Sequence, residues 1–442
     1  MIALIKGLQL LLSLSILVVL HELGHYLAAR YFKTRVEKFY LFMNPGFSLF
    51  KKQIGETEWG IGWLPLGGYV KISGMIDESM DTEQMSKPPQ PWEFRSKPAW
   101  QRLIIMLGGI IMNLIVGYVI YSMVLMVWGE KVLPNDYCVN VDPRLEQYGF
   151  QSGDQILKYN GKEIATYQDL RRTAFFEKVM EATVLRNGSE ELITLNKELG
   201  QLLIDEGIRS PFNLMFPSVI DSIDPGSNAE IAGLKSGDRI MSVNGFETGY
   251  QLMTKSQLAN KKSESILLTV DRGGNTLSIP AMTDTAGKLG FNFVLASNYL
   301  HLFEEKEITY RFGESLISGY HLASRTLKEY VISLRFLATK SGASQVGSLI
   351  TFGSIFDGSW NWLVFWRNTA FLSLILAFMN LLPIPALDGG HVMFLIYEMV
   401  TGKPAPDKVL EYAQVIGITF LLGLMVFALG NDFWRLFTGG FG

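Results

Sequence analysis

The chain has 442 residues, of which 48% are hydrophobic and only 18% are charged, and its formal net charge is −3 at pH 7. Soluble globular proteins carry about 25% charged residues, so this composition indicates a membrane protein. The chain has no overall excess of basic residues, which argues against nucleic acid as its main partner. The single cysteine, Cys138, excludes an intrachain disulfide.

Four apolar runs, uncharged except at Glu22 in the first, are long enough to cross a membrane, at residues 7–29, 103–129, 368–387 and 412–431. Lysine and arginine residues gather at both ends of the segment between the first two runs, whereas few follow the second run before Arg144. The positive-inside bias therefore predicts that this segment is cytoplasmic, and that the middle of the chain and both termini are extracytoplasmic. No cleavage site of small residues follows the first run, so we expect a retained span rather than a signal peptide.

The first run contains the sequence His-Glu-Leu-Gly-His at residues 21–25. A spacing of four places His21 and His25 on one face of a helix, with Glu22 beside them. Two imidazoles at this spacing can share one zinc ion, and the glutamate can take a proton from water. The bare pattern also arises by chance on soluble helices. Within an apolar span, however, an ionisable residue costs roughly 2.5–3.5 kcal/mol, and a divalent cation would compensate that cost.

A catalytic zinc site needs a third protein ligand. A metzincin would carry glycine at position 28 and histidine at position 31, but these positions hold Ala28 and Tyr31, so that class is excluded. Glu56 of the cytoplasmic segment could act like the glutamate of thermolysin, although no motif supports it.

Asp388 is the candidate that we prefer, because it ends the third apolar run near the predicted cytoplasmic face, at the expected depth of His21. It belongs to the sequence Asn-Leu-Leu-Pro-Ile-Pro-Ala-Leu-Asp-Gly at residues 380–389, whose prolines break the helix and expose backbone that must line protein or a water-filled cavity. His391 is an alternative ligand, although a supporting or interfacial role suits it better.

Four apolar-rich runs in the cytoplasmic segment, at residues 36–43, 47–54, 58–64 and 69–72, are separated by Asn, Pro and Gly turn signals. This pattern predicts a four-stranded β meander. The third run is too apolar for a hydrated loop, so we expect it to dip back toward the active site; an ordinary small sheet with one buried strand is the alternative. Residues 77–98 are polar and contain proline, which predicts a flexible connector.

The middle region contains an internal repeat, because residues 149–161 recur in similar form at 233–245. Each copy has a helix that ends at glycine, a Gly-Asp-x-Ile strand entry and an Asn-Gly hairpin turn. The pattern resembles the PDZ domain, which implies two tandem domains that can take up an extended peptide along a sheet edge. A role as bulky spacers is the alternative.

Apolar residues recur at three-four spacing between residues 313 and 340, at Leu316, Tyr320, Ala323, Leu327, Tyr330, Leu334 and Leu337. This spacing predicts a long amphipathic helix. The helix could lie on the outer membrane surface or pack on the second PDZ-like domain.

Taken together, the His-Glu-Leu-Gly-His sequence and the Asn380–Gly389 sequence resemble the site-2 protease family of intramembrane zinc proteases. The resemblance extends along the chain to Pro-Leu-Gly-Gly-Tyr-Val-Lys at residues 65–71 and to residues 430–436. It implies that zinc is the cofactor and that residues 59–69 belong to a membrane-reentrant β element. The site residues that it implies are the zinc ligands His21, His25 and Asp388, the general base Glu22, and the substrate-binding residues Asn380, Gly67, Gly68 and Tyr69.

Two departures from the family pattern concern helix geometry rather than the ligands. Residues 109–113 read Gly-Ile-Ile-Met-Asn, without the proline that often follows the glycine, and a Ser-Gly-Pro element appears as Val-Gly-Ser at 346–348. For Asn113 we favour a polar helix-packing contact. His301 and His321 lie outside the expected membrane site and receive no function.

The sequence therefore predicts a polytopic α-helical membrane protein with four transmembrane helices, a reentrant β element and two tandem extracytoplasmic PDZ domains. The expected segments are a first span with the zinc motif at 1–30, a cytoplasmic segment at 31–100, a second span at 101–129, PDZ domains at 130–212 and 213–298, an amphipathic segment at 299–360, a third span at 361–397 and a fourth at 398–442.

The resemblance implies a metalloprotease of the bacterial inner membrane. It would cut single-span proteins, such as anti-sigma factors or remnant signal peptides, after another protease has trimmed them outside. One alternative is a zinc-holding scaffold that binds clipped membrane peptides without cutting them, which would not need Glu22. A metal transporter is a third hypothesis, weakened by the lack of further polar residues strung across the spans.

Overall fold

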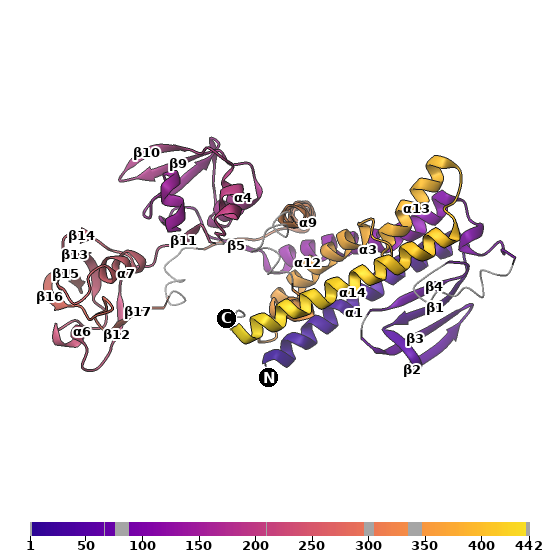
Figure 1. Cartoon of the computed structure of the whole chain (residues 1–442), viewed down its shortest axis with the longest axis horizontal. Coiled ribbons are helices and arrows are strands. Elements are labelled where there is room, and N and C mark those ends of the chain that lie inside the picture. The colour runs from indigo at the N-terminus through magenta and orange to yellow at the C-terminus, as the bar shows by residue number, and fades with distance from the viewer. Residues whose placement is uncertain are drawn as a thin grey trace. The chain divides into compact units, whose positions relative to one another are not determined.

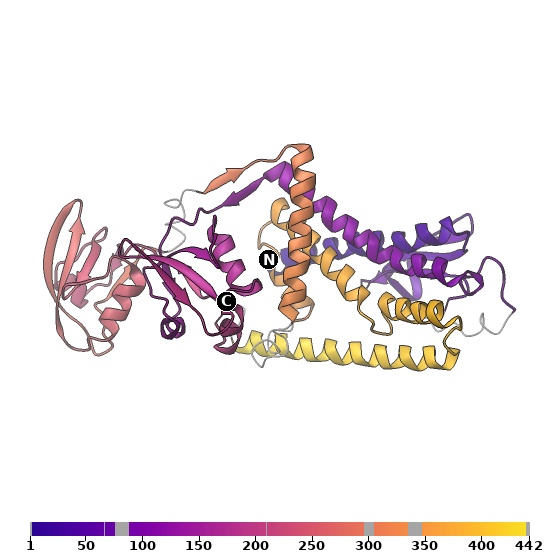
Figure 2. The ribbon, with the colours of Figure 1, turned by 90° about the horizontal axis from the view of Figure 1, so that it is seen from above.

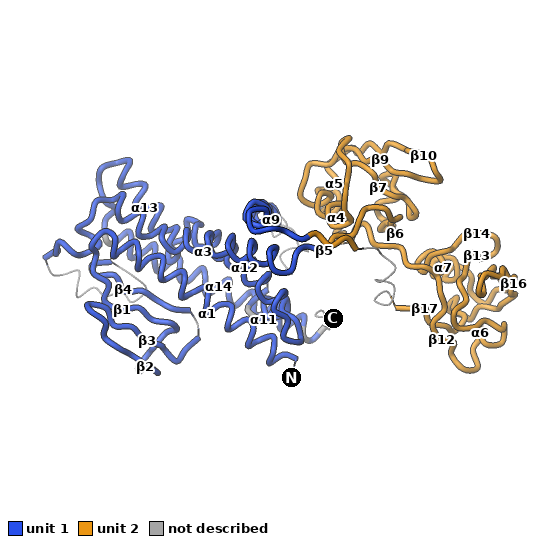
Figure 3. The backbone as a smooth tube through the Cα atoms, turned by 180° about the vertical axis from the view of Figure 1, so that it is seen from behind, with its two compact units in different colours: residues 1–130, 309–442 blue, residues 131–308 orange. Residues whose placement is uncertain are grey.

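A computed structural model describes residues 2–65, 67–75, 88–208, 210–295, 305–334 and 347–438. Leu66, residues 77–87 of the predicted connector, His301, Leu337 and Val346 lie outside these ranges. The chain forms two compact units, one made of residues 1–130 with 309–442 and the other of residues 131–308 (Figure 3).

Within the described residues, the first unit contains four helices that are long and apolar enough to cross a membrane (Figure 1). They are α1 (Ile2–Tyr31), α3 (Ala99–Trp128), α12 (Trp362–Leu381) and α14 (Asp407–Thr438). The third span ends earlier than predicted, because Pro383 and Pro385 cannot donate the backbone hydrogen bonds that would continue α12. Asp388 therefore does not close that span; it is the first residue of a separate helix, α13 (Asp388–Thr401).

Helix α3 is the centre of this unit and contacts α1, α12 and α13. It approaches α1 closely where Gly24 faces Gly108. A Cβ atom on Gly24 would lie 2.2 Å from the carbonyl oxygen of Gly108, so only glycine permits this approach. Small residues at such crossings let two membrane helices pack backbone to backbone.

The segment between α1 and α3 forms strands β1 (Val36–Leu41), β2 (Met43–Ile54), β3 (Thr57–Leu64) and β4 (Tyr69–Ile72). Their order is β2-β3-β1-β4, with β3 parallel to β1, so the meander prediction is wrong. Glycines of β3 explain this order: a Cβ atom would lie 2.3 Å from the Tyr40 ring at Gly60 and 2.2 Å from the Met43 carbonyl oxygen at Gly62. Because β3 fits between β1 and β2, β4 is left as an edge strand.

Helix α9 (Phe312–Ser333) runs across α3 and α12, an arrangement that neither sequence-based alternative specified (Figure 2). Its buried residues are Ser315, Gly319 and Ala323, whereas Tyr320 of the predicted apolar stripe is exposed. The buried face is thus made of small residues, because Gly319 meets the backbone of Ser122 on α3. Of the larger apolar side chains of the stripe, Tyr330 packs edge-on against Phe371 and Phe378 of α12, at 6.4 and 5.8 Å between ring centroids.

Asp432 attaches α14 to the short helix α11 (Leu349–Ser354). Its buried carboxylate accepts hydrogen bonds from the N–H and hydroxyl of Ser348, at 2.8 and 2.6 Å, and from those of Thr351, at 3.2 and 2.6 Å. The serine of the Val-Gly-Ser sequence at 346–348 therefore serves as a partner of the aspartate in the last helix.

The second unit contains two copies of one arrangement, which confirms the internal repeat as a structural repeat. The first copy has a sheet of order β10-β9-β7-β8, and the second has the matching order β16-β15-β13-β14. The first sheet comprises β7 (Gln155–Tyr159), β8 (Lys162–Glu163), β9 (Glu181–Arg186) and β10 (Ser189–Thr194). The second comprises β13 (Arg239–Val243), β14 (Phe246–Glu247), β15 (Ser265–Arg272) and β16 (Asn275–Met282).

Each copy adds a helix and a small two-stranded ladder. The first has α4 (Tyr167–Phe176) with β6 (Val139–Val141) and β11 (Phe212–Leu214), and the second has α7 (Gln251–Ala259) with β12 (Ile220–Ile223) and β17 (Phe291–Phe293). Both bury an equivalent ion pair, Asp154–Arg186 and Asp238–Arg272, at 2.8 and 2.6 Å. Helix α5 (Leu199–Asp205) is an addition of the first copy, and α6 (Asn228–Ile231) belongs to the second.

Candidate metal centre and active site

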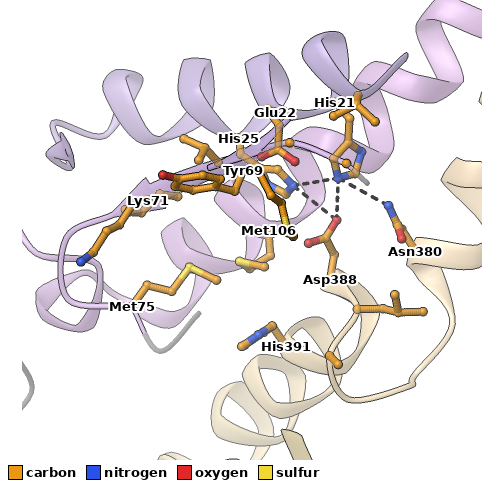
Figure 4. Close-up of a pocket in the computed structure, with 18 of the residues that line it drawn as sticks. His21, Glu22, His25, Tyr69, Lys71, Met75, Met106, Asn380, Asp388 and His391 are labelled. Carbon is orange, nitrogen blue, oxygen red and sulfur yellow. Dashed lines mark hydrogen bonds and ion pairs between the residues drawn. The ribbon is translucent and has the colours of Figure 1, made fainter. Parts of the chain in front are cut away.

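A cavity of about 610 Å³ in the first unit is lined by residues of α1, α3, α13, β4 and the loop between α12 and α13 (Figure 4). All the catalytic, metal-binding and substrate-binding residues that the family resemblance implies line it. They come from segments that are far apart in sequence, so the fold assembles the site from both ends of the membrane-embedded unit.

His21, His25 and Asp388 meet in this cavity and form a group that can hold a metal ion. The Nε2 atoms of the two histidines are 3.2 Å apart, and they lie 3.1 and 3.3 Å from Oδ2 of Asp388. Three ligands at roughly 2.0–2.1 Å from one tetrahedral ion would be separated by about 3.3 Å. The spacing of the three donor atoms fits a single zinc ion.

The surrounding hydrogen bonds also favour a cation between these atoms. Nδ1 of His25 lies 2.8 Å from the carbonyl oxygen of Ile105 and must donate its proton to it. In the neutral ring, Nε2 then has a lone pair that points to a carboxylate oxygen, which repels it. Oδ2 of Asp388 is buried and receives no hydrogen bond. A metal ion would satisfy both atoms.

Two asparagines contact His21. The side-chain amide of Asn113 lies 3.1 Å from Nδ1 and is buried, and the amide of Asn380 lies 3.4 Å from Nε2. Asn113 therefore contacts the ring atom that faces away from the ligand group, beyond the helix-packing contact expected for it. Asn380 lies on the cavity side, next to the ligand atoms (Figure 4).

Glu22 lines the same cavity, beside the start of strand β4. Gly68 lies so close to α1 that a Cβ atom there would be 2.8 Å from Val18 and 3.7 Å from Cγ of Glu22. Gly67, Gly68 and Tyr69 line the cavity as well. The carboxylate, the candidate ligands and one edge of the sheet thus share one space.

The apolar run of β3 does not line the cavity, contrary to our expectation. Its Trp59 stacks on Phe39 at 4.4 Å and contacts Tyr26 of α1 at 5.2 Å between ring centroids. The run is apolar because it packs within the sheet and on α1. Strand β4 and the first residues of β2, at 43–45, line the cavity in place of β3.

Two alternative ligands are separated from the ligand group. Glu56 is exposed and pairs with Arg30 at 3.2 Å, outside the cavity. His391 lines the cavity but is not a member of the group of three in the described part of the chain. His321 is exposed on α9.

Sequence reasoning missed three contributors to the site. A Cβ atom on Gly109 would lie 2.5 Å from both imidazoles, so this glycine makes room for them; the Gly108-Gly109 pair within a span was its signal. Gln414 of α14 is buried and lines the cavity, and a polar residue in an apolar span was its signal. The backbone carbonyl of Ile105 could not have been found from the sequence, because every residue has a backbone carbonyl group.

The sequence matches Peptidase family M50 over residues 9–424. The chain belongs to this family. M50 peptidases include the site-2 proteases, so the resemblance drawn from the sequence is confirmed. Family membership does not support a metal transporter.

Several relatives match this M50 peptidase over nearly its whole length. Protease RseP of Yersinia pestis is 27% identical over 96% of this chain and 98% of its own length. Regulator of sigma E protease of Haemophilus influenzae is 29% identical, with the same coverage of both chains. A protein of Neisseria meningitidis with the words zinc metalloprotease in its name is 26% identical over 97% of this chain and 99% of its own length. The chain is therefore a zinc metalloprotease of the membrane.

Proposed function

We propose that the enzyme hydrolyses a peptide bond within the membrane segment of single-span proteins, with His21, His25 and Asp388 as zinc ligands and Glu22 as general base. The observation that carries this proposal is the position of Glu22: its carboxylate lines the same cavity as the three ligand atoms, which lie within 4.8 Å of one another. A site that only retained zinc would not need this carboxylate.

Bound zinc would polarise the attacked carbonyl group and lower the pKa of water. Glu22 accepts the proton of the attacking water and later returns it to the leaving amine. Because Glu22 follows His21 directly on α1, the helix fixes it beside the ligands. The contacts of Ile105 and Asn113 hold the two imidazoles so that their Nε2 atoms face Asp388.

A transmembrane helix must unwind before its carbonyl groups can be attacked, because they are engaged in internal hydrogen bonds. Strand β4 can hold the unwound segment by strand addition, since β4 pairs with β1 on one side and lies at the edge of its sheet. Its residues from Tyr69 to Ile72 line the cavity. Asn380 would bind a backbone group of the extended substrate beside His21.

We place the enzyme in the bacterial inner membrane, with the sheet of β1–β4 on the cytoplasmic side and both termini outside. The two repeats are extracytoplasmic PDZ domains that hinder substrates with bulky external domains until another protease trims them. Suitable substrates are then anti-sigma factors or remnant signal peptides. The lysines and arginines at both ends of the segment 30–102 support this orientation.

Cleavage of a single-span substrate in liposomes tests the proposal. Glu22→Gln should abolish cleavage while zinc stays bound, whereas Glu56→Gln, which removes an exposed carboxylate outside the cavity, should cleave normally. Unchanged cleavage by Glu22→Gln would refute the role of Glu22 as base. Binding of the clipped peptide without any cleavage by the natural sequence would favour the zinc-holding scaffold.

A further inference from the structure

Two lysines lie directly opposite one another in the wall of the cavity. Lys38 of β1 pairs with Lys71 of β4 in the antiparallel register, and both line the cavity. Side chains of directly paired residues lie on the same face of a sheet, and like charges at such positions repel each other. The sheet therefore carries an arrangement that does not favour its own folding.

A nearby carboxylate balances one of the two charges. Lys71 forms an ion pair with Glu37 at 3.6 Å, and Glu37 also accepts a hydrogen bond of 2.8 Å from the hydroxyl of Ser73. Lys38 is half-buried, and its side-chain ammonium forms no ion pair or hydrogen bond within the described ranges of the chain. The acidic residues that line the cavity are Glu22 and Asp388, which belong to the proposed catalytic centre. One positive charge in the cavity is thus left without a partner.

The position of this charge relates it to the substrate. A peptide added to the edge of β4 would place one side chain beside Lys71, on the face that Lys38 shares. Gly68 lies beside Glu22 and directly precedes β4, and Lys71 follows three positions later within that strand. At about 3.3 Å per residue, this separates Lys71 from the cleaved bond by about 10 Å along the strand.

We propose that Lys38 and Lys71 form a specificity subsite for an aspartate or glutamate of the substrate, about three residues from the cleaved bond. This subsite rests on the proposed function, because it requires the substrate to lie along β4. It leaves the reaction unchanged and selects among unwound segments by the charge that they bring to the cavity. An anionic lipid headgroup could also supply the negative charge that these lysines bind, so the experiment must distinguish lipid from substrate.

The test uses the full chain in liposomes with single-span substrates that carry Asp, Asn or Lys at successive positions around the cleaved bond. At one position, Asp should be preferred over Asn by about fivefold in kcat/KM, the upper range for a solvent-accessible ion pair. The preference should act through KM, because the ion pair forms before the chemical step. Lys38→Met should abolish it, Lys38→Glu should prefer the Lys substrate, and Lys38→Arg should keep the preference for Asp.

Lys52→Met is the matched control, since Lys52 is exposed on β2 of the same sheet and does not line the cavity. It should retain the full preference. Binding of the same substrates to Glu22→Gln gives a second readout, which reports the subsite even if the natural sequence cleaves nothing. The subsite is refuted if Asp and Asn substrates are treated alike at every position. It is also refuted if Lys38→Met affects all substrates equally and only in liposomes with anionic lipid.

Discussion

Nδ1 of His25 lies 2.8 Å from the carbonyl oxygen of Ile105, and this contact determines which ring nitrogen faces Asp388. A neutral imidazole carries one proton, so donation from Nδ1 leaves the lone pair of Nε2 available to a metal ion. The contact joins α1 to α3, so the orientation of a ligand on one span depends on the backbone of the next. Such outer contacts fix the ring and tune metal affinity.

Asn113 should do for His21 what the Ile105 carbonyl does for His25. The amide nitrogen of Asn113 lies 3.1 Å from Nδ1 of His21, and with the amide group turned by 180° its carbonyl oxygen accepts the Nδ1 proton. We expect Asn113→Ala to weaken zinc binding by about 10–100-fold. Competition with a chelator measures this affinity without relying on activity.

Ser373→Ala is the control for Asn113, because its hydroxyl donates to the Asn113 backbone at 2.7 Å. It removes an interhelical hydrogen bond without altering a group that contacts an imidazole. A lower Tm with unchanged zinc affinity in Asn113→Ala would show that Asn113 is a helix-packing residue, as its sequence context alone favours.

Gly109→Ala should displace both imidazoles. The added methyl group would lie 2.5 Å from His21 and from His25, well inside contact distance, so α3 or the two rings must move. We expect loss of bound zinc and of cleavage, measured by metal analysis and a substrate assay. Gly7→Ala on α1 is matched to it, since nothing lies within 4 Å of its added Cβ atom. Full zinc content in Gly109→Ala would contradict the geometry of the site.

The second repeat should lose stability in acid through Asp238. Burial tends to raise the pKa of this carboxyl, but the hydrogen bonds from Arg272 and from the Lys235 backbone, together with the positive charges of both residues, lower the pKa below its usual value. A folded-state pKa below the unfolded value of about 3.9 gives stability that is present above that pH and lost as pH falls through the folded-state pKa.

Hydrogen-exchange protection of residues 220–293 in the full chain, followed from pH 6 downward, measures this loss. Asp238→Asn should lower the protection at pH 6 and flatten its dependence on pH. Asp221→Asn changes an exposed aspartate of the same repeat and should behave as the natural sequence does. An equally steep acid transition in Asp238→Asn would exclude this ion pair as the cause.

The grouping of His21, His25 and Asp388 could be predicted because it follows from residue types and short spacings. The histidines lie four apart on one helix, and Asp388 follows a proline-broken span. The strand order of the β1–β4 sheet could not be predicted from the sequence, because it depends on the approach of Gly60 to the Tyr40 ring, which is a tertiary contact. Likewise, the buried face of α9 is set by the fit of Gly319 against Ser122 rather than by its apolar periodicity.

Zinc content of the purified full chain is the most direct test that His21, His25 and Asp388 bind a single ion. The account predicts one zinc per chain in the natural sequence and in Glu22→Gln, and almost none in Asp388→Ala. Circular dichroism should show that the helices of Asp388→Ala are still folded. A full equivalent of zinc in Asp388→Ala would contradict it, because an ion that stays without this carboxylate is held somewhere else.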